Sequence, residues 1–367
     1  MTPPASIGIV MHDFPLGGTE RIALRLAGAW TAAGIAVTIF CGDESGPLRA
    51  MVPDAAALVV AEPSVPRGTG SRERLGRAAA RHFAAHPVDT LFVTGNFHWE
   101  VVPALAAIPG RPAIVAQISS PLALPQRGRF LQWRFGWRMR RMLGRADLLV
   151  AMDETGRRLA DATMRLGMTR AIPLPALDDA APQPLPATGC TILAAGRLIR
   201  QKGFDLLIAA FVALDDPAAR LVILGTGPEE AALGRQIDQA GAADRIMLAG
   251  YADDIRPHLD TARLFVLPSR FEGYGAVIIE ALGAGRPVIV SASTPAVGDV
   301  VTEPERGIVV PVGDIGALTA AMRRLLDRAP PDPDRLAGAV SAYRIGAGAK
   351  AYLDVFAEAM GQRAALS

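Results

Sequence analysis

Lysine and cysteine are the residues that this sequence most clearly lacks. Its 367 residues include two cysteines, Cys41 and Cys190, and two lysines, Lys202 and Lys350, against 36 arginines. Two distant cysteines exclude a disulfide framework and a cysteine-rich metal site, and they favour a reducing, cytoplasmic compartment. Because arginine stands almost everywhere that lysine could, a remaining lysine in a loop marks a place where a compact ammonium group is needed.

Long apolar runs are missing as well. No stretch reaches about 18 uncharged apolar residues, so the sequence predicts no membrane-spanning helix. The start, MTPPASIGIVMHD, has neither the basic nor the apolar segment of a secretory signal. Half of the residues are hydrophobic and a fifth are charged, which predicts a globular protein with a core large enough for two domains.

Several catalytic and cofactor motifs are absent. The sequence contains no complete Gly-x-Gly-x-x-Gly fingerprint, no P-loop and no Gly-x-Ser-x-Gly elbow, which argues against a nicotinamide enzyme and against those phosphate and acyl chemistries. The single Asp-x-Asp, Asp332 to Asp334, lies in a proline-rich turn and not after a strand. We therefore expect no metal site and no bound cofactor.

Apolar segments rich in β-formers alternate with helical patterns along the whole chain. This alternation predicts an α/β protein with two doubly wound, Rossmann-like domains that face a cleft. The expected strands are residues 6–12, 35–40, 89–94, 112–118, 147–152, 190–196, 220–225, 245–250, 263–269, 287–291 and 308–314. A proline-rich segment predicts a linker at 176–189, between a first domain (1–175, joined by a C-terminal helix at about 345–367) and a second domain (190–344).

The segment FEGYGAVIIE (271–280) carries two carboxylates between an apolar strand and the following helix. Ligands of open parallel sheets bind at such strand ends. Glu280 stands among residues patterned for burial, so its carboxylate needs donors, and vicinal ribose hydroxyls are donors of the right kind. Glu272 lies ahead of the helix, where sugar hydroxyls or a developing positive charge are the natural targets. The alternative is that Glu272 and Glu280 are ordinary surface carboxylates on a loop and a helix, without a ligand.

A second segment, GRLIRQKGFDLLIAAF (196–211), places Arg197 and Lys202 in a loop between a strand and a helix. Two cations beside a helix N-terminus predict a diphosphate site, although a solvated basic loop would have the same composition. Gly225 and Gly227 form the next strand-to-helix turn. They line the nucleotide pocket or serve an ordinary turn.

Three features of the first half are less specific. Gly17 and Gly18 precede a helix, which predicts phosphate contact or a simple glycine turn. His98 follows a predicted strand and has an acceptor-side or a structural role. Residues 127–145 carry seven arginines, four aromatics and no acidic residue, which favours an anionic membrane surface or a phosphate-bearing acceptor over a solvated helix. No nucleic-acid-binding module is recognisable.

Taken together, the second half resembles the donor domain of retaining glycosyltransferase family 4, which has the GT-B fold. The similarity runs from Gly196 to about Asp314, and GGTERIALRLA near the N-terminus fits the same family. The resemblance implies that Arg197 and Lys202 hold the donor diphosphate, Glu280 the ribose and Glu272 the transferred sugar. It also assigns backbone contacts with the sugar and phosphates to Gly18, Gly273, Tyr274 and Gly275.

Two departures from the family pattern concern the acceptor side. Where many members follow a strand with a histidine, this chain has IVAQISSP, with Ser119 or its neighbours in that place, and His98 would have to substitute from another loop. Asp299 stands where glutamate is common. We expect a changed acceptor and retained activity.

The resemblance implies a retaining, metal-independent hexosyltransferase in cell-envelope, exopolysaccharide or glycolipid synthesis. Its partners would be a nucleotide sugar and a saccharide or lipid-linked acceptor, with no nucleic acid, in the cytoplasm or at the inner face of the membrane. A sugar-nucleotide epimerase or hydrolase and a non-catalytic protein of the same fold are the alternatives. A glycogen-type phosphorylase is disfavoured, because only Lys350 remains to bind pyridoxal phosphate.

Overall fold

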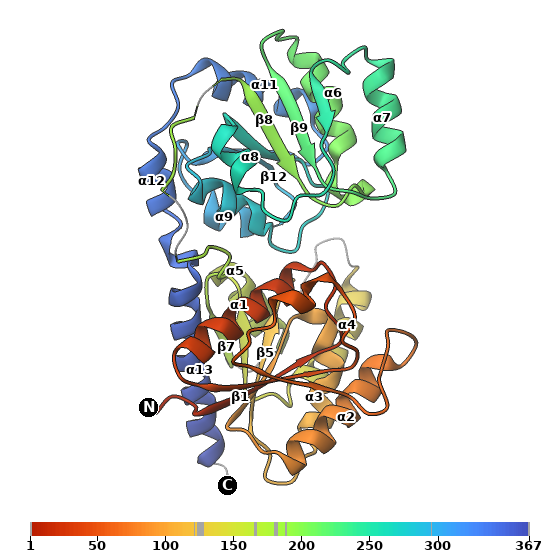
Figure 1. Cartoon of the computed structure of the whole chain (residues 1–367), viewed down its shortest axis with the longest axis vertical. Helices are drawn as coiled ribbons and strands as arrows, with labels where there is room; N and C mark the ends of the chain where they lie inside the picture. The colour runs from red at the N-terminus through yellow and green to blue at the C-terminus, as the bar shows by residue number, and fades with distance from the viewer. Residues whose placement is uncertain are drawn as a thin grey trace. The chain divides into compact units, whose positions relative to one another are not determined.

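The computed structural model describes residues 2–120, 122, 128–164, 167–179, 183–187, 189–294 and 296–365. The chain divides into two compact units, one made of Met1–Pro175 with Arg344–Ser367 and the other of Ala176–Tyr343 (Figure 1). Each unit is a parallel sheet covered by helices, and each is described by itself below.

The first unit has a seven-stranded sheet in the order β3-β2-β1-β4-β5-β6-β7. All of its neighbouring strands are parallel. The order reverses between β1 and β4, so the loops after these two strands leave toward opposite faces. The strands are β1 (Ser6–Met11), β2 (Ala36–Cys41), β3 (Ala57–Val60), β4 (Thr90–Val93), β5 (Ala113–Ile118), β6 (Leu148–Ala151) and β7 (Thr169–Ala171).

Helices cover both faces of this sheet. They are α1 (Gly18–Ala32), η1 (Pro47–Met51), α2 (Ser71–Ala85), η2 (Asn96–Val101), α3 (Val102–Leu105), α4 (Arg129–Leu143), α5 (Glu154–Met164) and α13 (Ile345–Ala364). In α1 the apolar residues Ile22, Leu26 and Trp30 recur at the spacing of one helix face and are buried.

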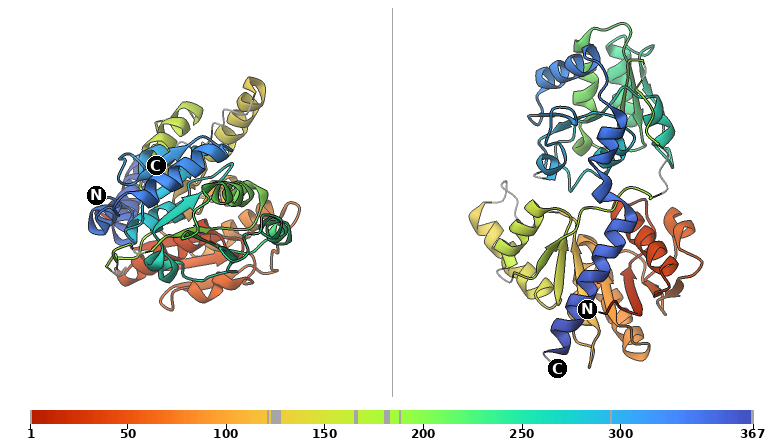
Figure 2. Two further views of the ribbon diagram at one scale, coloured as in Figure 1. Left: turned by 90° about the horizontal axis from the view of Figure 1, so that it is seen from above. Right: turned by 90° about the vertical axis from the view of Figure 1, so that its left-hand side faces the viewer.

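The C-terminal helix α13 is part of the first unit, where it packs against α1 and β5 (Figure 2). The indole Nε1–H of Trp30 donates to the carbonyl of Ala349 at 3.1 Å. The amide of Gln117 donates to the hydroxyl of Tyr352 at 2.9 Å. A cluster of edge-to-face rings joins Trp30, Tyr352 and Phe356, so aromatic packing binds the two ends of the chain together.

The second unit has a six-stranded parallel sheet in the order β10-β9-β8-β11-β12-β13. Here the order reverses between β8 and β11. The strands are β8 (Thr191–Ala195), β9 (Arg220–Leu224), β10 (Ile246–Leu248), β11 (Leu264–Leu267), β12 (Val288–Ser291) and β13 (Gly307–Val310). The helices are η3 (Arg200–Lys202), α6 (Phe204–Leu214), α7 (Glu230–Gln239), α8 (Arg256–Thr261), α9 (Ala276–Gly283), α10 (Ala296–Val300), α11 (Ile315–Asp327), α12 (Pro333–Gly338) and η4 (Ser341–Tyr343).

The predicted α/β class with two parallel sheets is confirmed, and each expected strand has its counterpart. Two strands were missed, β3 and β7, which form the two edges of the first sheet. The predicted linker, 176–189, includes residues 180–182 and 188, which lie outside the described residues; its described part holds neither a helix nor a strand. In the part of the chain that the structure describes, no helix combines the length and apolarity that crossing a membrane requires.

Candidate active site

The predicted donor residues lie at the switch point of the second sheet. Strands β8 and β11 are paired neighbours, with Ile192 opposite Leu264. The chain leaves β8 through the loop 196–203 and leaves β11 through the loop 268–275, both at the carboxyl edge of the sheet. The crevice outside such an edge, at a reversal of strand order, is where open α/β sheets bind ligands.

Polar contacts tie these two loops to each other. The side-chain amide of Gln201 donates to the carbonyl of Phe271 at 2.9 Å, and the backbone N–H of Arg270 donates to the carbonyl of Gln201 at 2.8 Å. The guanidinium of Arg270 donates two hydrogen bonds of 2.7 Å to Asp205. This bidentate pair lowers the pKa of the Asp205 carboxyl. The loops therefore form one braced surface.

Lys202, Glu272 and Ser269 form the centre of this surface. The ammonium Nζ of Lys202 lies 2.5 Å from Oε1 of Glu272, and the hydroxyl of Ser269 donates to the same oxygen at 2.6 Å. Glu272 is only 6% exposed and Ser269 is fully buried. A buried carboxylate needs such partners, so the two donors hold the Glu272 side chain in one position.

Sequence reasoning missed Ser269. Its signal was available: a serine close to a strand end, three residues ahead of the glutamate expected to act. We expect Ser269→Ala to lower kcat by about tenfold, the worth of one hydrogen bond to a charged group. The measurement is steady-state kinetics at saturating donor.

Ser291 offers a matched control for this variant. It too is a buried serine at the end of a strand in the same sheet. Its hydroxyl makes no hydrogen bond within the described residues. Ser291→Ala should leave kcat unchanged, and equal losses in the two variants would show that Ser269 acts only through general packing.

The other predicted donor residues lie on the same two loops and on α9. Arg197 is exposed, on the loop directly after β8, and the described part of the chain gives it no ion pair. Glu280 lies in the second turn of α9 and is half-buried, and Tyr274 is 6% exposed. Gly275 is the N-cap of α9 with φ of +82°, a conformation that favours glycine. The roles of these residues and of Gly273 stay predictions.

Gly225 and Gly227 have a packing role that explains them by itself. A Cβ on Gly225, whose φ is +136°, would lie 1.9 Å from the carbonyl oxygen of Gly196. A Cβ on Gly227 would lie 2.4 Å from the carbonyl oxygen of Leu198. The loop after β9 therefore runs directly against the backbone of the loop after β8, and only glycine permits that approach. Contact with a nucleotide stays a prediction.

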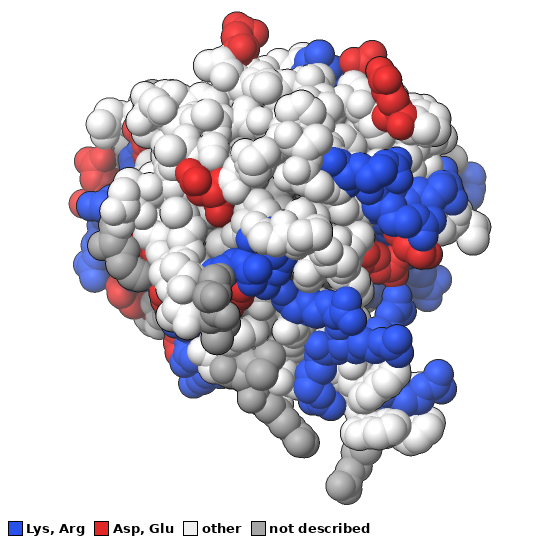
Figure 3. All heavy atoms as spheres, turned by 90° about the horizontal axis from the view of Figure 1, so that it is seen from below, with Lys and Arg blue, Asp and Glu red and all other residues white. Residues whose placement is uncertain are grey.

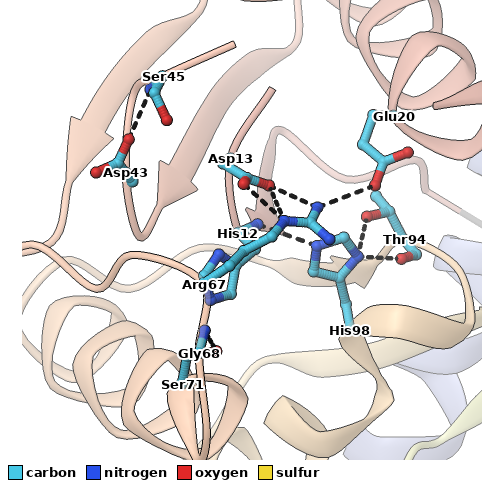
Figure 4. Close-up of polar contacts among 10 residues, drawn as sticks. All are labelled: His12, Asp13, Glu20, Asp43, Ser45, Arg67, Gly68, Ser71, Thr94 and His98. Carbon is cyan, nitrogen blue, oxygen red and sulfur yellow. Dashed lines mark hydrogen bonds and ion pairs between the residues drawn. The ribbon is translucent and has the colours of Figure 1, made fainter. Parts of the chain in front are cut away.

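The first sheet also has polar residues at its switch point, between β1 and β4 (Figure 4). Gly17 is the N-cap of α1, and a Cβ on it would lie 2.0 Å from an oxygen of Glu20. Glu20 is 7% exposed, and burial raises the pKa of its carboxyl. A carboxylate at this helix end interacts favourably with the helix dipole. A Cβ on Gly18 would meet nothing within 4 Å; its phosphate contact stays a prediction.

His98 is fully buried, and its two ring nitrogens are both engaged. Its Nε2 accepts a hydrogen bond from the backbone N–H of His12 at 3.0 Å, and its Nδ1 lies 2.6 Å from the carbonyl of Thr94. These contacts require a neutral ring with the proton on Nδ1. His98 therefore joins the ends of β1 and β4, which is the structural one of the two roles that the sequence left open; an acceptor contact stays a prediction.

Ser119, the other acceptor-side candidate, is half-buried and paired with Asn96. Its hydroxyl accepts from the Asn96 backbone N–H at 3.1 Å and donates to the Asn96 side-chain oxygen at 3.0 Å. Its own backbone N–H donates to that same oxygen at 2.8 Å. These contacts link the loops after β4 and β5, and an acceptor contact stays a prediction.

Arg67 and Asp13 form an ion pair that sequence reasoning missed. The guanidinium donates to both carboxylate oxygens of Asp13 at 2.6–2.8 Å, lies 3.9 Å from Glu20 and covers the ring of Phe97 at 4.1 Å. Figure 4 shows these charges beside His12 and His98. Asp13 lies two residues after the end of β1, and this position close to a strand end was its only signal in the sequence.

The burial of His98 makes the stability of the chain depend on pH. Burial lowers its pKa to about 4, whereas histidine in an unfolded chain has a pKa of about 6.5. As the pH falls, His98 is protonated in the unfolded chain before it is protonated in the folded one. The contribution of the buried, neutral His98 to the free energy of unfolding is therefore complete above about pH 6.5 and is lost as the pH falls toward 4. We expect the melting temperature to fall between pH 7 and pH 5, and His98→Asn to reduce that fall.

His12 and His82, whose pKa values burial also lowers, act in the same direction, so the variant should flatten the profile in part. The measurement is a thermal melt at each pH. His258→Asn, in the second unit, is the control and should reproduce the wild-type profile. A His98→Asn profile parallel to that of the wild type would contradict the assignment.

One further sequence feature, the Asp-x-Asp pair, has a structural role. Asp332 is the N-cap of α12 and accepts from the backbone N–H of Asp334. Asp299 is exposed on α10.

Among the residues that the structure describes, no three His, Cys, Asp or Glu side chains are grouped as a metal site would require. In the basic stretch 127–145, residue 127 lies outside the described residues, and α4 contains most of the rest.

Comparison with known proteins gives two domain matches. Residues 17–176 match the model described as "Glycosyl transferase 4-like domain", and residues 189–328 match "Glycosyl transferases group 1". The lipopolysaccharide core biosynthesis glycosyltransferase LpsD of Rhizobium meliloti is 33% identical over 226 residues, 59% of this chain and 63% of that protein. The mannosyltransferase LpsB of the same organism is 34% identical over 153 residues, 39% of this chain and 42% of that protein. The chain thus aligns with about half the length of these relatives.

Solved structures match over nearly the whole chain. The lipopolysaccharide outer core galactosyltransferase WaaB has a TM-score of 0.73 at 14% identity, covering 95% of this chain and 98% of that one. HepE of Anabaena, in complex with UDP and glucose, has a TM-score of 0.69 at 18% identity, with 98% of both chains covered. At these identities the match establishes the fold, which is GT-B.

Proposed function

Because this chain belongs to the group 1, family 4-like glycosyltransferases of GT-B fold, we propose that it transfers a sugar from a nucleoside diphosphate sugar to a hydroxyl group of an acceptor. The observation that carries this proposal is the set of Lys202, Glu272 and Ser269 on two braced loops at the switch point of the second sheet. A cation and an oriented carboxylate at one place suit a substrate that carries both a diphosphate and sugar hydroxyls.

In the proposed reaction the bond between the anomeric carbon and the diphosphate oxygen breaks, and the electron pair leaves with the diphosphate. The acceptor oxygen forms the new bond to that carbon, and its proton passes to a donor phosphate oxygen. Negative charge grows on the diphosphate as positive charge grows on the sugar. Lys202 and Arg197 would stabilise the first, and Glu272 the second, at the moment when these charges develop.

We also propose that the anomeric configuration is retained and that no metal or other cofactor is needed. The support for the second point is the pair of cations on the loop after β8, which can neutralise the diphosphate without a divalent ion. Two measurements test this: the anomeric coupling constant of the product by proton NMR, and the activity in excess EDTA. Inversion, or loss of activity restored by magnesium or manganese, would contradict the respective point.

The proposed acceptor is a saccharide, free or lipid-linked, of the cell envelope or of an extracellular polysaccharide. LpsD and WaaB, by their names, act in lipopolysaccharide synthesis. We propose a reducing, cytoplasmic compartment, because Cys41 and Cys190 are both free thiols. Cys41 is buried, and burial raises the pKa of its thiol to about 12, which disfavours the reactive thiolate form.

A panel of nucleotides tests the proposal directly. We expect one of UDP, GDP or ADP, and its sugar conjugate, to raise the melting temperature by several degrees. A ligand at a hundredfold excess over Kd adds about 2.7 kcal/mol of stability. If none of the three binds, the result supports the alternative of a non-catalytic protein of this fold.

Incubation with the binding nucleotide sugar alone distinguishes the epimerase or hydrolase alternative. In the absence of an acceptor, a glycosyltransferase should leave the donor intact over a period in which it would transfer the sugar if a saccharide acceptor were present. Formation of an epimer without any acceptor would replace the proposed function by the alternative.

A further inference from the structure

Helix α4 carries large apolar side chains on the face that points away from its unit. Phe130, Leu131, Trp133 and Trp137 are 66, 58, 61 and 54% exposed. The other two tryptophans of the chain, Trp30 and Trp99, are buried. Grouped exposed aromatics on a soluble domain mark an interaction surface.

The fold does not need this face for its own stability. Met139, Met142 and Leu143 of α4 are buried in the core of the first unit, and Phe135 packs against that core. At about 100° per residue, these side chains lie on the side of the helix opposite Phe130. The helix is therefore held by its inner face, and a second apolar face remains uncovered.

Cations alternate with the rings on the outer face. The ring of Phe130 stacks on Trp133 at 6.0 Å. The guanidinium carbon of Arg134 lies 6.0 Å from the centre of the Phe130 ring, and that of Arg141 lies 5.6 Å from the Trp137 ring. Helix α4 contains no acidic residue. Neither Arg134 nor Arg141 has a carboxylate partner among the described residues, so both charges are available to an anionic surface.

The position of the helix suits such a contact. In both views of Figure 2, α4 lies at the margin of the first unit. The space-filling view from below shows basic side chains gathered toward the lower right, with uncharged atoms between them (Figure 3). A broad, laterally extended partner can reach this margin without entering the sheet edge where the polar residues of Figure 4 lie.

We propose that the outer face of α4 (Phe130, Leu131, Trp133, Arg134, Trp137 and Arg141) docks the protein onto a membrane surface rich in anionic lipid. Aromatic rings, and indoles above all, favour the headgroup region, where an apolar body and a polar edge are both accommodated. Arginine binds lipid phosphates through two hydrogen bonds, and its charge is attracted by the negative surface. Helices of this composition lie in the interface plane and do not span the bilayer.

Charge argues against a second copy of this face as the partner. Aromatic and arginine side chains also occur at protein interfaces. Without any carboxylate on this helix, however, a second copy of this face would meet like charge with like charge. An anionic bilayer supplies negative charge along the full length of the helix. The proposal does not depend on the reaction described above, and its test requires no substrate.

Flotation with lipid vesicles tests the proposal on the full chain. We expect binding to vesicles with about 30% phosphatidylglycerol in phosphatidylcholine, weak binding to pure phosphatidylcholine, and release by salt. Trp133→Ala with Trp137→Ala should abolish binding. Arg134→Gln with Arg141→Gln should weaken it by at least about tenfold, since each basic residue near an anionic surface contributes about fivefold.

Tryptophan fluorescence adds a reading that reports on the face itself. Vesicle binding should shift the emission of the wild-type protein to shorter wavelength. Trp133→Phe with Trp137→Phe should still bind and show no shift, because Trp30 and Trp99 are already buried. A shift that persists in this variant would contradict the proposed face.

Two matched controls use the second unit. Arg235→Gln with Arg324→Gln removes two exposed arginines of α7 and α11 and the same charge. Met247→Ala with Val309→Ala removes two exposed apolar side chains. Both should bind vesicles as the wild type does, and thermal melts verify folding. The proposal is overturned if the wild type does not float with anionic vesicles, if all variants float equally, or if ultracentrifugation shows that the tryptophans only support self-association.

Discussion

Replacement of Lys202 by alanine should lower kcat by about two to three orders of magnitude with the fold intact. Removal of a single preorganised group that stabilises developing charge costs this much in other enzymes. Lys202 lies at the switch point of the second sheet, 2.5 Å from Glu272. The ammonium would meet the diphosphate as its charge grows. The measurement is steady-state transfer with the nucleotide sugar identified by thermal shift.

The composition of the chain provides an unusually close control. Lys350, the only other lysine, is exposed on α13 of the first unit, and Lys350→Ala should be fully active. Lys202→Arg tests whether a compact ammonium is required: we expect at least about a tenfold loss, because a planar guanidinium cannot take the same place beside Glu272. A fully active Lys202→Ala enzyme would sink the proposed role.

Replacement of the two glutamates should affect different steps. We expect Glu272→Gln to lower kcat by about a hundredfold or more, while the affinity for the nucleoside diphosphate is retained or increases. The amide can still accept from Ser269, so the loop keeps its shape, and Lys202 loses its competing carboxylate. The charge that stabilises the transition state is what is lost.

Glu280→Gln should show the converse. Glu280 lies eight residues further along the chain, half-buried in the second turn of α9, and is proposed to bind the ribose. We expect weaker nucleotide binding, by about tenfold, the worth of one hydrogen bond to a charged group, and a smaller change in kcat. Isothermal titration with the nucleoside diphosphate, together with kinetics, separates the two effects. Equal losses of affinity in both variants would contradict the division of roles.

The fold was largely predictable because parallel strands buried on both faces are continuous apolar runs. β4 (Thr90–Val93) and β11 (Leu264–Leu267) are buried along their full length and were recognised on that ground. β3 and β7 were missed because they are not continuous, fully buried apolar runs. They are the edges of the first sheet, partly exposed, and β7 is three residues long with an arginine at its centre. The pairing of such strands is decided by the neighbouring strand more than by their own pattern.

In the candidate site, the positions of the residues were predictable from the sequence, whereas their contacts were not. The sequence alone was sufficient to place Arg197, Lys202, Glu272 and Glu280 on loops and helices after strands, because carboxylates and cations beside glycines at strand ends have few structural uses. It could not show that Ser269 and Lys202 share one oxygen of Glu272, or that Arg270 holds Asp205. Lys202 and Glu272 are 70 positions apart in the chain, and Asp205 and Arg270 are 65 positions apart.

His98 shows the same limit from the other side. As a histidine after a strand it was a candidate for acceptor contact, yet packing buries it completely and hydrogen-bonds both of its nitrogens. What the sequence determined by itself was the class of fold, the family and the residue types at the donor end, since these follow from local pattern. Which side chains pair, which are buried and which face of α4 stays open was decided only by the tertiary structure, because burial and charge pairing depend on neighbours that are distant in the chain.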